Sequence, residues 1–141
     1  MSPIRRCLPG DRDPGESRPV WLLAFYAQAE LDSLAQSACM SLGDYERAEF
    51  HAYRSLASLR PHMKRSRAIT TSRLARAQLE QDAVEEATAT AMSVSTEAAV
   101  QHPRVALMLR EFGARLEAIA PGSAAAGTWS EYARATWGAA A

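Results

Sequence analysis

The apolar residues of this chain recur every three or four positions, which is the spacing of one face of a helix. No stretch alternates apolar and polar residues over the length of a strand. The pattern predicts about six helices, separated by short turns. We expect them at residues 20–42, 44–59, 62–80, from 82 onward, 103–119 and 124–138. The sequence therefore predicts an all-α fold.

The first predicted helix, residues 20–42, is strongly apolar. We expect its deepest stripe to face the protein core. That stripe consists of Val20, Ala24, Ala27, Leu31, Leu34, Ala35, Ala38 and Leu42. A helix with so few polar positions is either sandwiched between neighbours or associates with a second copy of itself.

The stretch Leu42–Leu59 predicts a tight joint between two helices. Gly43 suits the left-handed conformation that ends a helix, and the Asp44 side chain suits the free N–H groups that begin the next one. Ala48 of this second helix aligns with Ala87 of the helix that is predicted from residue 82 onward. Two helix pairs at this offset predict stacked antiparallel hairpins, neither of which buries its apolar face alone.

The stretch LGDYERAEFHAYRSLASLRP resembles the second half of a tetratricopeptide repeat (TPR). It has Gly-Asp-Tyr at the turn, then Ala48 and the small residue Ala52 in the helix, and Pro61 after it. Asp32 and the pair Ala35-Gln36 stand where the repeat usually has Trp and Leu-Gly. The resemblance implies a TPR-like architecture of stacked hairpins.

From about Trp21 to the last residue, the chain is similar to the C-terminal TPR-like domain of actinobacterial helix-turn-helix (Xre-type) transcriptional regulators. The similarity is carried by LGDYERAE, RSRAITTSRLARAQL and HPRVALMLREFGARLEAIAP. It implies a sensory or protein-interaction module of a bacterial transcriptional regulatory system. The family's DNA-binding domain precedes this module, whereas a short segment rich in Pro and Gly precedes the first helix here. We therefore expect no direct nucleic-acid binding.

The composition predicts a single helical domain, residues 20–141, after a flexible arm at residues 1–19 in which Pro and Gly disfavour a helix. Lys and Arg together number 16, as do Asp and Glu, so no net charge attracts nucleic acid to the whole chain. No apolar run is long enough to span a membrane. Arg5 and Arg6 are not followed by the apolar segment of a secretory signal, so we expect a cytoplasmic protein.

Charge is unevenly distributed along the chain, because residues 50–79 contain seven basic residues and no Asp or Glu. In an array of stacked hairpins, the first helix of each pair lines the concave surface. Arg65, Arg73 and Arg76 would then face an acidic peptide terminus or a phosphate. The alternative is a solvated face that the acidic starts of neighbouring helices neutralise.

Aromatic residues gather near both ends of the helical region. They are Trp21, Phe25 and Tyr26 near its start, and Trp129, Tyr132 and Trp137 near its end. These side chains either wall a small-molecule pocket between helices or, as is more common, belong to the core or close a dimer interface.

No catalytic motif accompanies these features. His51, His62 and His102 lack the spacing of a zinc pair, and the chain has neither a Gly-rich phosphate loop nor a nucleophilic serine elbow. We therefore expect no catalytic residue, no metal and no cofactor.

Three interpretations follow from the sequence. The leading one is a non-enzymatic helical-repeat module that binds a protein or peptide partner, for which an acidic segment would suit the basic face. The second is a small-molecule-binding pocket protein, or an enzyme recruited from this fold. The third is a structural homodimerisation domain built on the first or last helix.

Overall fold

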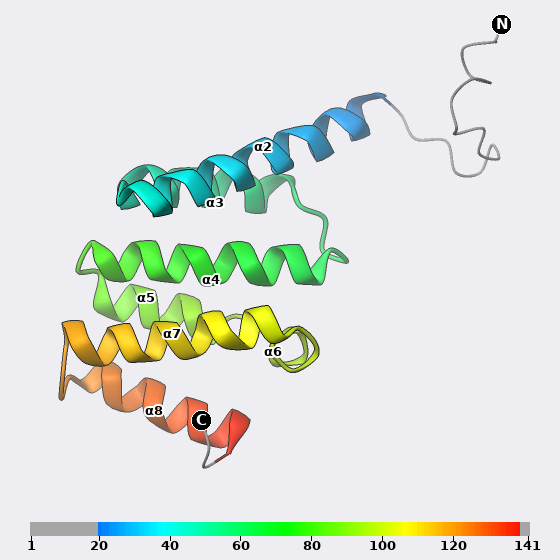
Figure 1. The fold of residues 1–141 in the computed structure, drawn as a ribbon. Helices are drawn as coiled ribbons and strands as arrows, with labels where there is room; N and C mark the ends of the chain where they lie inside the picture. Colours follow the sequence, from blue (N-terminus) through cyan, green and yellow to red (C-terminus); the bar gives the residue numbers. More distant parts are fainter. Residues whose placement is uncertain (1–19, 139–141) are drawn as a thin grey trace, which may run out of the picture.

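The computed structural model of this chain describes residues 20–138, apart from the side chain of Phe25. Within these residues every regular element is a helix, which confirms the predicted all-α class (Figure 1). The predicted arm at residues 1–19 lies outside the described residues, and so do residues 139–141 of the predicted domain.

Seven helices make up the described part of the chain. They are α2 (Val20–Leu42), α3 (Tyr45–Ser58), α4 (Lys64–Glu80), α5 (Val84–Met92), α6 (Thr96–Gln101), α7 (Pro103–Ile119) and α8 (Ala124–Trp137). Six of them correspond to predicted helices, and α6 was not predicted. The Ser95 hydroxyl begins α6 by accepting a hydrogen bond from Ala98 N at 3.2 Å. The helix predicted from residue 82 onward is therefore divided in two, because Ser93 ends α5 and Ser95 begins α6.

The helices pack as successive pairs, α2 with α3, α4 with α5 and α7 with α8, while α6 lies against α4 and α7. Figure 1 shows α2 and α8 at opposite ends of the stack, with α4 and α7 between them. Helix α4 contacts α2, α3, α5, α6 and α7, and nine of its 17 residues are buried. It is the central helix of the described structure.

The three helix pairs repeat one local geometry. Ala48, Ala87 and Ala126 are evenly spaced along the sequence, and all three are buried with at most 4% of their surface exposed. Each pair turns at a residue with positive φ, which is 78° at Gly43, 70° at Asp82 and 71° at Gly122. The sequence indicated the first two units, and the structure adds α7–α8 as a third.

The predicted inward face of residues 20–42 is wrong. Its residues Val20, Leu31, Leu34 and Leu42 are 60–82% exposed. The buried positions of α2 are instead Ala29, Asp32 and Gln36. The two polar side chains have partners on neighbouring helices; Gln36 Nε2, for example, donates to Thr70 O at 3.4 Å. Helix α2 is therefore oriented with these polar residues facing inward.

The last pair is held together by an aromatic cluster around Trp129, which is 6% exposed. Its ring meets Phe112 edge to face, with ring centroids 5.1 Å apart. Gly113 of α7 makes this approach possible, because a Cβ at that position would lie 2.5 Å from Trp129 Nε1. Helix α8 therefore packs closely on α7 because Gly113 has no side chain to keep the Trp129 ring away.

Replacing Gly113 with Ala should destabilise the protein. Alanine normally stabilises a helix interior by about 0.5–1 kcal/mol relative to glycine. At this position the new Cβ displaces the buried Trp129 ring, and overpacking of this kind costs about 1–3 kcal/mol. Urea unfolding followed by circular dichroism measures the change in the free energy of unfolding.

Gly127 of α8 provides the matched control, because a Cβ there would meet no atom within 4 Å. Gly127→Ala should raise the free energy of unfolding by about 0.5–1 kcal/mol. Equal stabilisation by both alanines would contradict the packing described for Trp129.

Candidate binding groove

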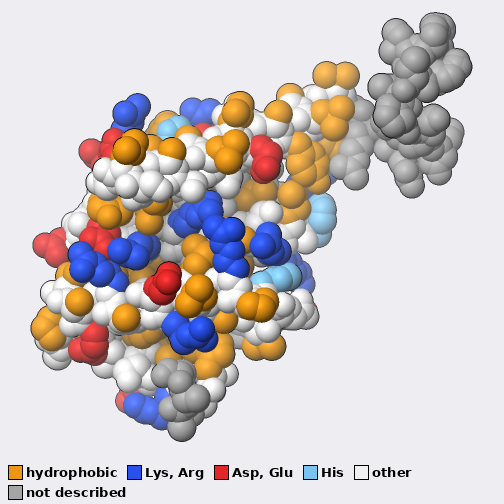
Figure 2. All heavy atoms as spheres, in the orientation of Figure 1, with side chains coloured by type: hydrophobic (Ala, Val, Ile, Leu, Met, Phe, Trp, Pro, Cys, Tyr) orange, Lys and Arg blue, Asp and Glu red, His pale blue; other side chains and the backbone are white. Residues whose placement is uncertain are grey.

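A groove runs along α4 between α2 and α7. It consists of two adjoining hollows of about 230 and about 170 Å³, and Arg73 lines both of them. Arg65 and Arg104 line the larger hollow together with Glu30 of α2. Figure 2 shows Lys and Arg side chains gathered over this part of the surface. We call the two hollows the basic groove.

Three arginines of the basic groove lack an acidic partner in the described part of the chain. Within residues 20–138, Arg65, Arg73 and Arg104 form neither an ion pair nor a hydrogen bond. Burial lowers the pKa of the Arg73 guanidinium, and the positive charge of nearby Arg104 lowers it further. A guanidinium nevertheless stays protonated at physiological pH, so the burial and the repulsion remain as a free-energy cost. An anion bound in the groove would offset that cost.

Arg104 was not predicted as a site residue, because it lies outside the acid-free segment 50–79. It occupies the first turn of α7, where acidic residues are favoured and none is present, and the first turn of α4 likewise has none. Figure 1 shows α4 and α7 beginning on the same side of the molecule. The positive ends of two helix dipoles therefore reinforce the charge of the arginines. In the sequence, a cation directly after Pro103 at the start of a predicted helix was the feature that could have identified Arg104 as a site residue.

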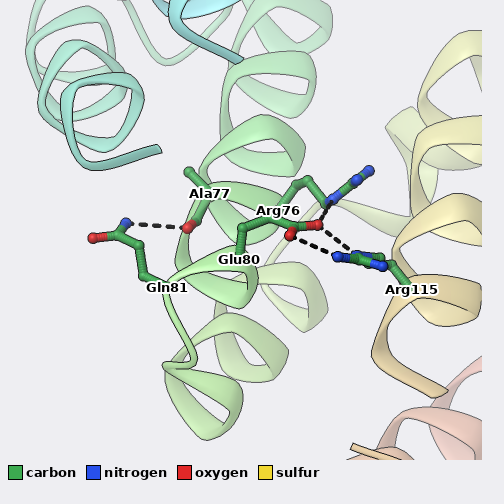
Figure 3. Close-up of polar contacts among 5 residues, drawn as sticks. All are labelled: Arg76, Ala77, Glu80, Gln81 and Arg115. Atoms are coloured by element: carbon green, nitrogen blue, oxygen red, sulfur yellow. Dashed lines mark hydrogen bonds and ion pairs between the residues drawn. The ribbon is translucent and has the colours of Figure 1, made fainter. Parts of the chain in front are cut away.

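Arg76, the third predicted arginine, is already neutralised. It lines the smaller hollow, but its Nε lies 2.7 Å from Glu80 Oε2. Arg115 of α7 donates to both oxygens of the same carboxylate, at 2.6 and 3.0 Å (Figure 3). The hydrogen bonds from Arg115 and Arg76 keep the pKa of Glu80 below its ordinary value, although burial acts in the opposite direction. Glu80 thus joins α4 to α7.

Two further contacts join α4 to α3 at its two ends. The side-chain nitrogen of Gln81 donates to Ala77 O at 3.0 Å (Figure 3). It also donates to Glu49 Oε1 of α3 at 2.9 Å. At the other end, Arg67 Nη1 donates to the carbonyl oxygens of Leu56 and Leu59, where α3 ends. A cation is favoured at the C-terminus of a helix. Arg67, one of the seven basic residues of segment 50–79, therefore has a structural role.

Asp32 is the centre of a polar cluster between α2 and α3, and only 2% of its surface is exposed. Gln28 Nε2 donates to its carboxylate at 2.8 Å, His51 Nδ1 lies 2.9 Å from Oδ1, and Arg54 Nε lies 3.4 Å from Oδ2. Burial raises the pKa of this carboxyl group. The hydrogen bonds from Gln28 and His51 and the charge of Arg54 outweigh burial, so the pKa of Asp32 lies below its ordinary value. The cluster gives His51 a structural role.

The two predicted aromatic groups line different cavities. Trp21 and Tyr26 line one of about 220 Å³ between α2 and the end of α3. Trp129 and Trp137 line one of about 500 Å³ between α7 and α8. Helices α2 and α8 lie at opposite ends of the stack (Figure 1), so the groups do not meet across one pocket.

The aromatic group of α8 belongs mainly to the core. Tyr132 and Trp137 pack against the buried Trp129 ring, and the Tyr132 hydroxyl donates to Met92 O at 3.4 Å. Trp137 Nε1 is buried and has no hydrogen-bond partner within the described chain. This donor is the one polar feature of the cluster that the described residues do not explain.

Within residues 20–138, no three His, Cys, Asp or Glu side chains lie together as a metal site would require. No helix in this part of the chain has the length and apolar character needed to cross a membrane.

Replacing Asp32 with Asn should lower the free energy of unfolding by about 1–3 kcal/mol at neutral pH, because hydrogen bonds and an ion pair to a buried charge are lost. The pKa of Asp32 is lower in the folded than in the unfolded chain. Its contribution is therefore complete above the unfolded-state value of about 4 and is lost as the pH falls through the folded-state pKa. Urea unfolding of both proteins at about pH 7 and about pH 2 measures the difference.

Glu97→Gln is the control, since it removes an exposed ion pair with Lys64 at 3.4 Å. It should change the free energy of unfolding by less than about 0.5 kcal/mol. A variant Asp32→Asn as stable as the wild type at neutral pH would show that the cluster does not hold α2 to α3.

Comparison of the chain with models of known protein families, with curated proteins and with solved structures gave no match. The resemblance to TPR-like regulator domains therefore stays a prediction.

Proposed function

We propose that this chain is a non-enzymatic helical-repeat module that binds an acidic peptide or protein segment in the basic groove. The observation that carries the proposal is Arg73, a half-buried guanidinium that lies beside a second arginine, Arg104, and has no acidic partner among the described residues. Folding leaves this charge uncompensated, and a carboxylate from a partner would accept its hydrogen bonds in bidentate geometry.

The size of the groove favours a peptide over a drug-sized ligand. Its two hollows, about 230 and about 170 Å³, are each smaller than the roughly 300–1,000 Å³ typical of small-molecule pockets. They lie one after the other along α4, as the side chains of an extended segment would. Arg65, Arg73 and Arg104 would bind the acidic groups of such a segment.

The biological setting follows from the sequence resemblance alone. A TPR-like module of this kind would work in the cytoplasm, within a bacterial transcriptional regulatory circuit, without contacting DNA itself. The balance of 16 basic and 16 acidic residues agrees with that expectation, because it gives no global attraction to nucleic acid.

A small-molecule ligand is the second candidate, and the cavity of about 500 Å³ between α7 and α8 favours it. Its size is ordinary for such a site, and Trp137, whose buried Nε1 has no partner among the described residues, lies in its wall. A ligand there, with or without catalysis, would raise the melting temperature of the wild type and of groove variants alike. A ligand of the basic groove would not stabilise the groove variants.

The groove is tested with a fluorescein-labelled hexaglutamate peptide, whose binding is measured by fluorescence anisotropy at low salt. Arg73→Gln should weaken binding roughly tenfold to a hundredfold, because a hydrogen bond to a charged group contributes about 1.5–3 kcal/mol. Arg73→Lys keeps the charge but loses the bidentate geometry, so its affinity should lie between those of the wild type and Arg73→Gln. Charge reversal of Arg65, Arg73 and Arg104 together should abolish binding.

Two controls make the result specific to the groove. Arg47→Gln changes an arginine whose side chain is 74% exposed on α3, and Arg76→Gln changes the arginine already paired with Glu80. Each should alter the affinity by less than about threefold, since Arg47 does not line the groove and Glu80 neutralises Arg76. Equal loss in all variants, or equal binding of hexalysine, would contradict the proposed site.

A further inference from the structure

The outer face of α2 is an apolar surface that the groove does not explain. Val20 and Leu42 are each 82% exposed, Leu34 is 66% exposed and Leu31 is 60% exposed. Ala24, Ala27 and Ala38 lie between them at helical spacing and are exposed as well. Figure 2 shows hydrophobic side chains at the surface along this helix, on the side away from the basic groove. We call these seven residues the α2 stripe.

The α2 stripe carries no charge along its whole length. Residues 20–42 contain two charged side chains, Glu30 and Asp32. Asp32 points into the protein, and Glu30 lines the basic groove. A helix on the surface of a monomer normally presents charged residues to water on the side opposite its buried face. An uncharged apolar stripe about 35 Å long is instead typical of an interface.

The order of large and small residues makes the α2 stripe complementary to itself. It reads nearly the same in both directions about Leu31. When two copies lie antiparallel, Val20 meets Leu42, Ala24 meets Ala38, Ala27 meets Leu34 and Leu31 meets Leu31. Small side chains opposite large or small ones allow two helices to approach to about 8–10 Å. A two-fold axis through Leu31 satisfies all of these contacts at once.

The available area fits a reversible dimer. One third of the circumference of a helix about 10–12 Å wide and about 35 Å long is roughly 370–440 Å² per copy. Two copies would bury roughly 730–880 Å², which is less than stable specific interfaces bury and is in the range of weak, transient ones. Because the chain has no net charge, two copies meet without long-range repulsion.

We propose that this chain forms a two-fold symmetric homodimer in which the α2 stripes of two copies pack antiparallel. The basic groove lies on another side of α2 and remains open in such a dimer. Each dimer would present two grooves, so a partner with two acidic segments would gain avidity. The dimer does not depend on the groove binding any ligand.

Sedimentation equilibrium of the full chain tests the dimer. At a concentration of about 100 μM the mass should approach twice the 15.3 kDa of one chain, and it should fall toward one chain on dilution to about 1 μM. The double variant Leu31→Glu, Leu34→Glu should remain a monomer throughout, with an unchanged circular dichroism spectrum because both positions are exposed.

Val100→Glu is the matched control, because Val100 is a 71% exposed apolar residue on α6, away from the α2 stripe. It should dimerise like the wild type. A wild type that stays at 15.3 kDa, or a double variant that still dimerises, would overturn the proposal.

Cysteine cross-linking tests the antiparallel arrangement in a chain whose Cys7 and Cys39 are replaced by Ser. With Leu31→Cys, mild oxidation should join two copies, because position 31 lies on the two-fold axis. With Val20→Cys alone no cross-link should form, whereas a mixture of Val20→Cys and Leu42→Cys chains should give one. Cross-linking of Val20→Cys to itself without that of Leu31→Cys would contradict the antiparallel pairing.

Discussion

Burying a basic helix at the centre of the stack is the constraint on which the rest of this structure depends. Helix α4 contacts five other helices, yet it carries five basic residues before its first acidic one, Glu80. A buried cation is costly unless it is paired or hydrogen-bonded. Alanines such as Ala68 and Ala75 let neighbouring helices come close to α4, so three of its five basic side chains are partly buried and the other two stay exposed. The hydrogen bonds and ion pairs that each arginine forms therefore decide how α4 is fixed against its neighbouring helices.

The arginines of α4 divide into those that the described chain satisfies and those that it does not. Arg67 ends α3 by binding its last carbonyl oxygens, and Arg76 shares Glu80 with Arg115 of α7. These contacts fix α4 against both neighbours and so shape the groove between them. Arg65 and Arg73 receive no such partner within residues 20–138, and α7 adds Arg104 to them. The same charge pattern that costs folding energy is thus the basis of the proposed anion site.

Local sequence signals predicted the helices and the first two helix pairs well, because caps, turns and apolar spacing act within a few residues. Long-range contacts decided the rest. The α2 stripe was expected inside, since nothing in residues 20–42 shows that Asp32 would find His51 and Arg54 and turn that side inward. Arg76 was expected to be available because Arg115, which shares Glu80 with it, lies on a helix far along the sequence. Only the fold could assign these pairings.

The most direct test of the central claim is an NMR spectrum of the arginine Nε–Hε groups of the full chain, titrated with an acidic peptide. The side-chain signals of Arg65, Arg73 and Arg104 should shift and sharpen as carboxylates bind them. Those of Arg67, Arg76 and Arg115, which already have partners in the protein, should stay in place. Shifts confined to exposed arginines elsewhere, such as Arg47 and Arg134, would show that the uncompensated charge of α4 is not a binding site.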